Sequence, residues 1–90
     1  MQTYQITMLR KLGMNRFSDE EPVGQVEADL LGPAKRFASE YINNWLIDRK
    51  LAVRTRGDWA KDVKRGGFSR EIVVTENGQM AIMVFVLREA

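Results

Sequence analysis

The chain has 90 residues, with 14 Lys and Arg against 12 Asp and Glu, and it contains neither cysteine nor histidine. These absences exclude disulfides, thiol nucleophiles, Ser-His-Asp triads and metal sites built from imidazole or thiolate groups. No apolar run approaches the roughly 18 residues of a membrane span, and no signal peptide is recognisable. We therefore expect one small cytoplasmic domain over residues 1–90 that binds no membrane.

Catalysis would have to rely on carboxylates, lysines and hydroxyls, and no spacing among these groups is typical of acid–base chemistry. The chain is therefore expected not to be an enzyme and to need no cofactor or metal. Charge is unevenly distributed, with five acids and no base from Asp19 to Asp29 and eight bases from Arg49 to Arg70. This segregation either steers a charged partner or reflects solvated loops and edge strands.

The first half of the chain predicts two strands and a helix. Residues 3–10 alternate, with Tyr4, Ile6 and Met8 on one face, which indicates a half-buried strand. Residues 11–22 are expected to form a loop and residues 25–29 a short strand. A helix then begins at Gly32-Pro33, because proline is favoured at the first helical position, and extends to about residue 48.

An apolar stripe on this helix predicts its buried face. The stripe comprises Ala34, Phe37, Ala38, Tyr41, Ile42, Trp45 and Leu46. We expect the aromatic members Phe37, Tyr41 and Trp45 to anchor the helix on the sheet. Base stacking by these rings is the less favoured alternative.

The second half predicts three more strands. Residues 51–56 form one, with Arg54 and Arg56 pointing outward, and residues 57–67 form a charged loop around Trp59. Residues 68–76 and 79–88 form a hairpin, because Asn77-Gly78 suits a type I′ turn. This turn pairs Glu76 with Gln79 and places Ile72 opposite Met83.

The fold class that follows is α+β, an antiparallel four- to five-stranded sheet with one amphipathic helix packed on one face. The other face presents the strip Met80, Ile82, Val84 and Val86 without a second helix to cover it. Either the loop around Trp59 covers this strip, or the last strand is central and the long side chains of its neighbours shield it, or the strip contacts a partner or a second copy in a homodimer.

The basic segment could contact phosphates through Arg54 and Arg56 on a strand and through Lys61, Lys64 and Arg65 in the following loop. No helix-turn-helix pair, RNA-recognition signature or GXXG loop accompanies these residues. The sequence therefore predicts nucleic-acid contact without identifying a motif.

Residues 25–40 resemble the strand-to-helix segment of the small phage-encoded type I-F anti-CRISPR proteins. The matching positions are Gln25, Glu27, Ala28, Leu31, Ala34, Lys35, Arg36, Ala38 and Ser39. Glu40 departs from the pattern, since the family helix continues with a basic residue there. The resemblance implies a sheet flanked by a helix, with Lys35 and Arg36 in a basic patch that faces nucleic acid and Tyr4 as a further partner contact.

The function implied is that of a phage inhibitor in the host cytoplasm. It would disable a CRISPR surveillance complex by stoichiometric binding to protein subunits of that crRNA-guided assembly. The predicted partner-binding residues are Tyr4, Lys35, Arg36, Arg54, Arg56, Lys61, Lys64 and Arg65. The alternative left open is a small non-enzymatic regulator that binds DNA or RNA directly through the basic segment.

Overall fold

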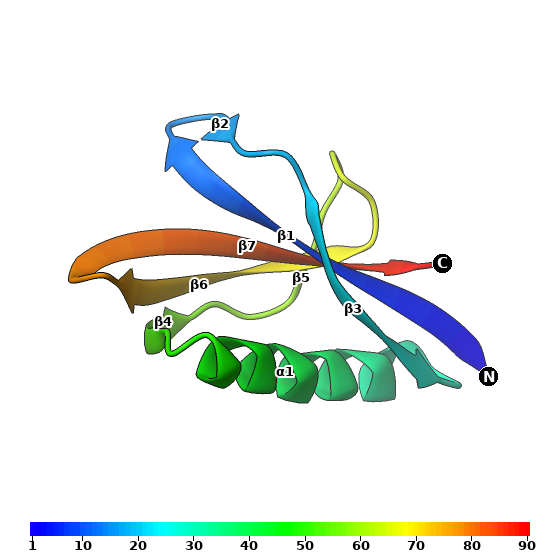
Figure 1. Cartoon of the computed structure of the whole chain (residues 1–90). Helices are drawn as coiled ribbons and strands as arrows, with labels where there is room; N and C mark the ends of the chain where they lie inside the picture. The colour runs from blue at the N-terminus through cyan, green and yellow to red at the C-terminus, as the bar shows by residue number, and fades with distance from the viewer.

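A computed structural model describes all residues from Met1 to Ala90 and shows an α+β fold with one helix and seven strands (Figure 1). The elements in chain order are β1 (Gln2–Gly13), β2 (Arg16–Phe17), β3 (Glu21–Ala28), α1 (Leu31–Asp48), β4 (Ala52–Arg56), β5 (Ala60–Lys61), β6 (Phe68–Glu76) and β7 (Gln79–Glu89). No helix has the length and hydropathy needed to cross a bilayer.

The strands form one antiparallel sheet whose main order is β2-β1-β7-β6-β4. β3 pairs with the first part of β1 and β2 with its last part, while β5 pairs with β6 beyond β4. The predicted loop over residues 11–22 is therefore wrong, because β1 extends to Gly13 and β3 begins at Glu21. The α+β class is confirmed, with two strands of two residues in addition to those predicted.

The β6–β7 hairpin has the predicted register, with Glu76 opposite Gln79 and Ile72 opposite Met83. Asn77 and Gly78 both have positive φ, at 51° and 80°, as a type I′ turn requires. β7 lies between β1 and β6 in the sheet, and Met83, Phe85 and Leu87 are fully buried on the side of the helix. The turn thus sets which side chains of β7 enter the core.

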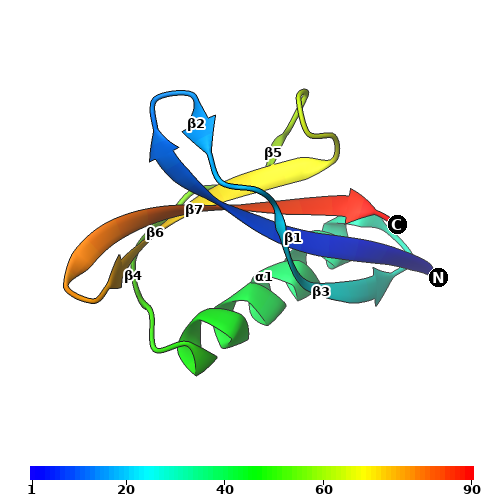
Figure 2. The ribbon, with the colours of Figure 1, turned by 45° about the horizontal axis from the view of Figure 1, so that its top comes forward.

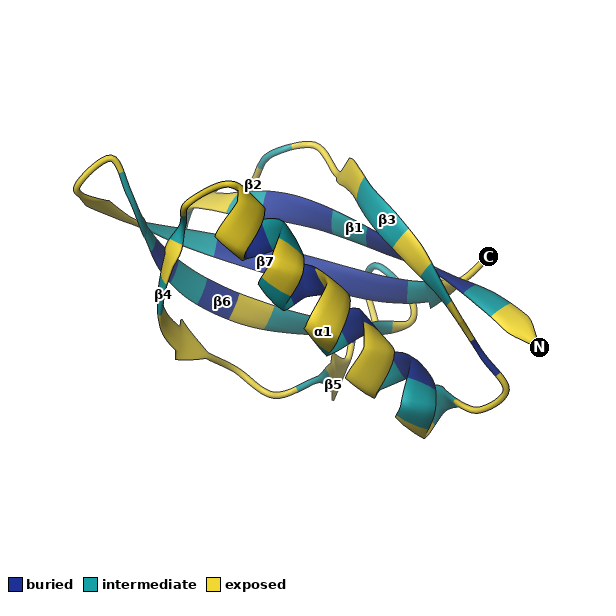
Figure 3. Cartoon of the chain, turned by 60° about the horizontal axis from the view of Figure 1, so that its bottom comes forward, coloured by how far each residue is buried: buried dark blue, intermediate teal, exposed yellow.

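One face of the helix is buried against the sheet (Figure 3), and the buried side chains are small or aliphatic. The buried residues are Ala34, Ala38, Ile42 and Leu46, spaced four apart. Phe37 and Tyr41 are 38% and 39% exposed, so the prediction that they anchor the helix is wrong. The two alanines allow a close approach of helix and sheet, which leaves the larger rings on the flank beside β3. Of the three aromatic residues, Trp45 is the one that contacts a core ring, edge-to-face on Phe85 at 5.7 Å.

Trp59 packs against the main core beneath the helix and donates from Nε1 to Ser39 on the helix. The expectation that its loop covers the other face with this ring is therefore wrong. On that other face Leu9, Val84 and Val86 form a second buried cluster, while Met80 near the turn remains 65% exposed. Two of the four residues of the predicted apolar strip, Val84 and Val86, are thus ordinary core, and Ile82 is half-buried.

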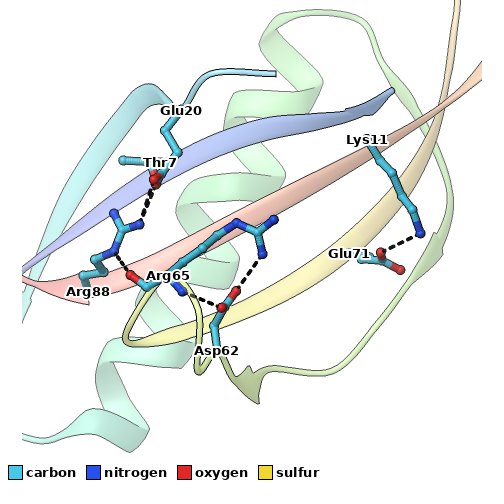
Figure 4. A network of polar contacts seen from close by, with 7 residues as sticks. All are labelled: Thr7, Lys11, Glu20, Asp62, Arg65, Glu71 and Arg88. Atoms are coloured by element: carbon cyan, nitrogen blue, oxygen red, sulfur yellow. Dashed lines mark hydrogen bonds and ion pairs between the residues drawn. The ribbon is translucent and has the colours of Figure 1, made fainter. Parts of the chain in front are cut away.

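Polar contacts that join the strands to two loops lie on the same face of the sheet as this second cluster (Figure 4). Residues 14–20 and residues 62–67 rise on the side of the sheet opposite α1 (Figure 2). Arg65 lies over the ring of Phe17 at 4.5 Å, and Arg88 donates both to the Arg65 carbonyl oxygen and to Glu20. Lys11 and Glu71 form an ion pair beside them. We call this arrangement the ionic cover.

Three carboxyl groups that pair with arginines, Glu20, Asp62 and Glu76, predict how the stability of the fold varies with pH. The hydrogen bond from Arg88 lowers the pKa of Glu20, and that from Arg10 lowers the pKa of Glu76. Burial raises the pKa of Asp62, but hydrogen bonds from Arg65 and Ser69 outweigh it and leave the pKa below its usual value. These groups stabilise the fold fully above the unfolded-state pKa, roughly 4, and this stabilisation is lost as the pH falls through the lowered values.

We therefore expect the free energy of unfolding to be flat above about pH 5 and to decline below about pH 4. Urea unfolding at a series of pH values measures this decline. The double variant Glu20→Gln/Glu76→Gln should show a shallower decline, whereas Glu40→Gln, at an exposed helix position without an ion pair, should behave as the original chain. An equal slope in all three proteins would contradict the assignment.

Candidate nucleic-acid interface

Four cations meet where α1 faces the edge formed by β4, β5 and β6. Lys35 comes from the helix, and Arg56, Lys61 and Arg70 come from β4, β5 and β6. Directly opposed residues of paired strands point to the same face, and Arg56 and Lys61 oppose Ile72 and Phe68, which face the helix. We name Lys35, Arg56, Lys61 and Arg70 the basic flank.

Arg70 is the most enclosed member of the basic flank. Its guanidinium donates to the hydroxyl oxygen of Ser39 and to the carbonyl oxygen of Gly57, both at 2.9 Å. Ser39 also accepts the bond from Trp59, whose ring centroid is 5.5 Å from the guanidinium carbon. These contacts fix one cation and one aromatic ring against the side of the helix.

Arg56 approaches the same helix one turn further along. Its guanidinium donates twice to the amide oxygen of Asn43, at 3.3 and 3.1 Å. A register shift between Val53 and Thr55 places Arg56 opposite Ile72, on the helix side of the sheet. This shift corrects the prediction that Arg54 and Arg56 both point away from the helix.

Lys35 and Lys61 complete the basic flank around Phe68. The ammonium group of Lys35 lies 3.9 Å from the centroid of the Phe68 ring, an energetically favourable cation–π contact. Lys61 is exposed and pairs with Phe68 across the strands. The aromatic ring thus has a cation on it and another beside it.

No carboxylate lies within ion-pair distance of any member of the basic flank. The lysines and arginines that form ion pairs are Arg10, Lys11, Arg65 and Arg88, and three of these belong to the ionic cover on the opposite face. Burial, followed by the positive charge of Arg56, lowers the pKa of Arg70, which Asp58 only partly offsets. The basic flank therefore retains positive charge that an anion could neutralise.

The remaining predicted site residues lie in different places. Arg36 is exposed on α1 beside the Phe37 ring rather than with Lys35, because consecutive helical residues point about 100° apart. Arg54 is exposed at the register shift of β4, and Lys64 is exposed in the loop before β6. These three residues are accessible but outside the basic flank.

Two predicted contacts are not on any open basic surface. Tyr4 is 5% exposed and belongs to the main core, with its hydroxyl bonded to Gln2. Arg65 is bound to Asp62 at 3.1 Å and stacked on Phe17 in the ionic cover, across the sheet from the basic flank. Burial of the first and ion pairing of the second remove both from the candidate interface.

The predicted set omitted Arg70, the central member. A signal was present in the sequence, because Arg70 has the same parity in its strand as Phe68 and Ile72, which face the helix. A cation at such a position must lie at the margin of the core and reach a polar partner. Ser39 was not among the predicted site residues either, although it accepts hydrogen bonds from the side chains of Trp59 and Arg70.

Comparisons with known proteins add no assignment: no family model, no curated protein and no solved structure matches this chain. The structure contains no group of three or more acidic residues arranged to hold a metal ion. The interface therefore has to be interpreted from its own geometry.

Proposed function

We propose that this chain is a non-enzymatic phage inhibitor that binds a crRNA-guided surveillance complex stoichiometrically and presents the basic flank to its nucleic-acid channel. The observation that supports the proposal is the concentration of four cations without carboxylate partners on one side of the helix. Arginine forms bidentate contacts with phosphate, and lysine acts as a point charge. The surface is thus suited to a polyanion.

The resemblance over residues 25–40 supports the choice of target. It implies a sheet flanked by one helix, and this chain has a sheet flanked by α1. Lys35, one of the matching positions, belongs to the basic flank. Two independent features, the segment and the surface, therefore converge on the same helix.

Direct binding to DNA or RNA is the second candidate, and the same basic flank supports it. Trp59 beside Arg70 and Phe68 beneath Lys35 are both half-buried, so two aromatic rings accompany the cations. The two functions differ in what the isolated chain binds. A direct binder retards plain duplex DNA, with a log–log salt slope near 0.9 per phosphate contacted, whereas an inhibitor directed at protein subunits barely binds DNA alone.

The decisive measurement is protection of a phage or plasmid against an active type I CRISPR system. The double variant Arg56→Glu/Lys61→Glu replaces two exposed cations with carboxylates, which carry the same sign of charge as phosphate. We expect at least about a hundredfold loss of protection at matched expression, because several kcal/mol of attraction become repulsion. Both residues are exposed, so the fold should persist. Circular dichroism checks this.

Single variants supply a matched control. Lys61→Glu and Arg16→Glu change the net charge equally, but Arg16 lies on β2 outside the basic flank. Lys61→Glu should weaken protection and Arg16→Glu should leave it intact. Full protection by the folded double variant would remove the basic flank from the site. Absence of protection by the original chain, together with steep salt-dependent DNA binding, would favour the second candidate.

A further inference from the structure

The opposite edge of the sheet has a different chemistry. β3 pairs with β1 on one side and has no strand on the other, so part of its backbone hydrogen-bonding capacity faces outward. Its exposed side chains include Glu21, Gln25 and Glu27, and neither glutamate forms an ion pair. This edge is acidic, whereas the edge at β4 and β5 is basic.

A groove accompanies this edge. It has a volume of about 400 Å³ between α1 and β3, and it is lined by Val23, Tyr41, Asn44, Trp45, Asp48 and Arg49. The Tyr41 hydroxyl donates to the Val23 carbonyl oxygen, and its ring occupies the space that a side chain at Gly24 would need. Tyr41 is thereby fixed against β3 while 39% of its surface remains exposed.

Arginine and aromatic side chains dominate this flank of the helix. The guanidinium carbon of Arg49 lies 3.8 Å from the Trp45 ring centroid, and Arg36 lies over Phe37 at 5.4 Å. Trp, Tyr and Arg are the residue types most enriched among the strongest contributors to protein interfaces. Acidic side chains along the edge disfavour a nucleic-acid ligand here, because phosphates would be repelled.

From these observations we infer that the β3 edge binds an extended segment of a partner protein in which basic and aliphatic residues alternate. The segment adds as a strand beside residues 24–28, because Pro22 and the register shift before Gly24 end the regular edge. Its basic residues face Glu27, and an aliphatic residue beside Gly24 contacts Tyr41, where the groove begins. This inference does not depend on the proposed function, since it concerns the other edge of the sheet.

A short synthetic peptide in which lysine and valine alternate tests the inference, with the corresponding glutamate–valine peptide as its counterpart. Titration into the full chain, followed by NMR, should slow amide hydrogen exchange at residues 24–28 with the lysine peptide alone. Glu27→Lys should weaken binding about fivefold, because an attractive cross-strand pair becomes repulsive. Asp58→Lys makes the same charge change near the opposite edge and should leave the affinity within twofold.

Any of four results would overturn the inference. The first is that the lysine peptide does not bind, and the second is that both peptides bind with equal affinity. The third is that the lysine peptide binds without any change in amide exchange at residues 24–28. The fourth is self-association of the original chain that Glu27→Lys abolishes, because the occupant of this edge would then be the basic β4 edge of a second copy.

Discussion

Phe85→Ala is expected to destabilise the fold by about 3–5 kcal/mol, the usual cost of emptying a buried aromatic site. Phe85 is fully buried in β7 and forms an edge-to-face pair with Trp45, which contributes about 0.5–1.5 kcal/mol beyond burial. Domains of this size have a total stability of only about 5–15 kcal/mol. Urea unfolding followed by circular dichroism should therefore show a greatly lowered midpoint or an unfolded chain.

Phe37→Ala provides the comparison within the same chain. Because the Phe37 ring is 38% exposed on the helix flank, its removal should cost less than about 1.5 kcal/mol. Phe85→Leu, which retains much of the volume, should fall between the two. Equal losses from Phe37→Ala and Phe85→Ala would contradict the orientation of the helix described above.

Gly67→Ala is expected to cost about 2–5 kcal/mol, as the sum of a left-handed backbone and a steric conflict. Gly67 has φ of 65°, and a Cβ atom there would overlap the backbone carbonyl oxygen of Leu87 in the centre of the sheet. Neither backbone can move easily, because Gly67 also accepts a hydrogen bond from the amide of Asp62. The unfolding midpoint measures the effect.

Gly66→Ala is the matched control for this substitution. Gly66 also has positive φ, at 82°, but a Cβ atom there would meet nothing within 4 Å. Its cost should be limited to the backbone preference, about 1–2 kcal/mol. A Gly67→Ala variant as stable as Gly66→Ala would show that the loop before β6 does not approach β7 closely.

Local signals in the sequence were sufficient for several elements. Asn77-Gly78 specifies its turn without reference to the rest of the chain, so the register of the β6–β7 hairpin was predictable. The helix was predictable from its period and from Pro33, but its orientation was not. The helix has two series of apolar residues at a spacing of four, one from Ala34 to Leu46 and one from Phe37 to Trp45, and either series could be the buried face. The short distance between helix and sheet favours burial of the series that contains the two alanines. This distance is set by the tertiary packing and therefore could not be predicted from the helix sequence.

The candidate site was predictable as a set of cations but not as an arrangement. A cation is available to a partner only if no carboxylate of the chain pairs with it. Such ion pairs join distant positions, such as Arg88 and Glu20, which are 68 residues apart. Arg65 and Lys61 are four residues apart in a basic segment, yet they lie on opposite faces of the sheet because one belongs to the ionic cover and the other to β5. Charge patterning along a sequence contains no information about such pairing.

The central position of β7 has a consequence for biosynthesis. This strand, residues 79–89, lies between β1 and β6, so the part of the sheet around β1 and the part around β6 can join only after β7 has been made. Most of the 90 residues therefore leave the ribosome while the apolar faces of β1, β6 and α1 are still without β7, against which they pack. Folding of the sheet then depends on contacts of high sequence separation, which form only after residues 79–89 have been made. The nascent chain should consequently be most vulnerable to proteases and aggregation just before β7 emerges.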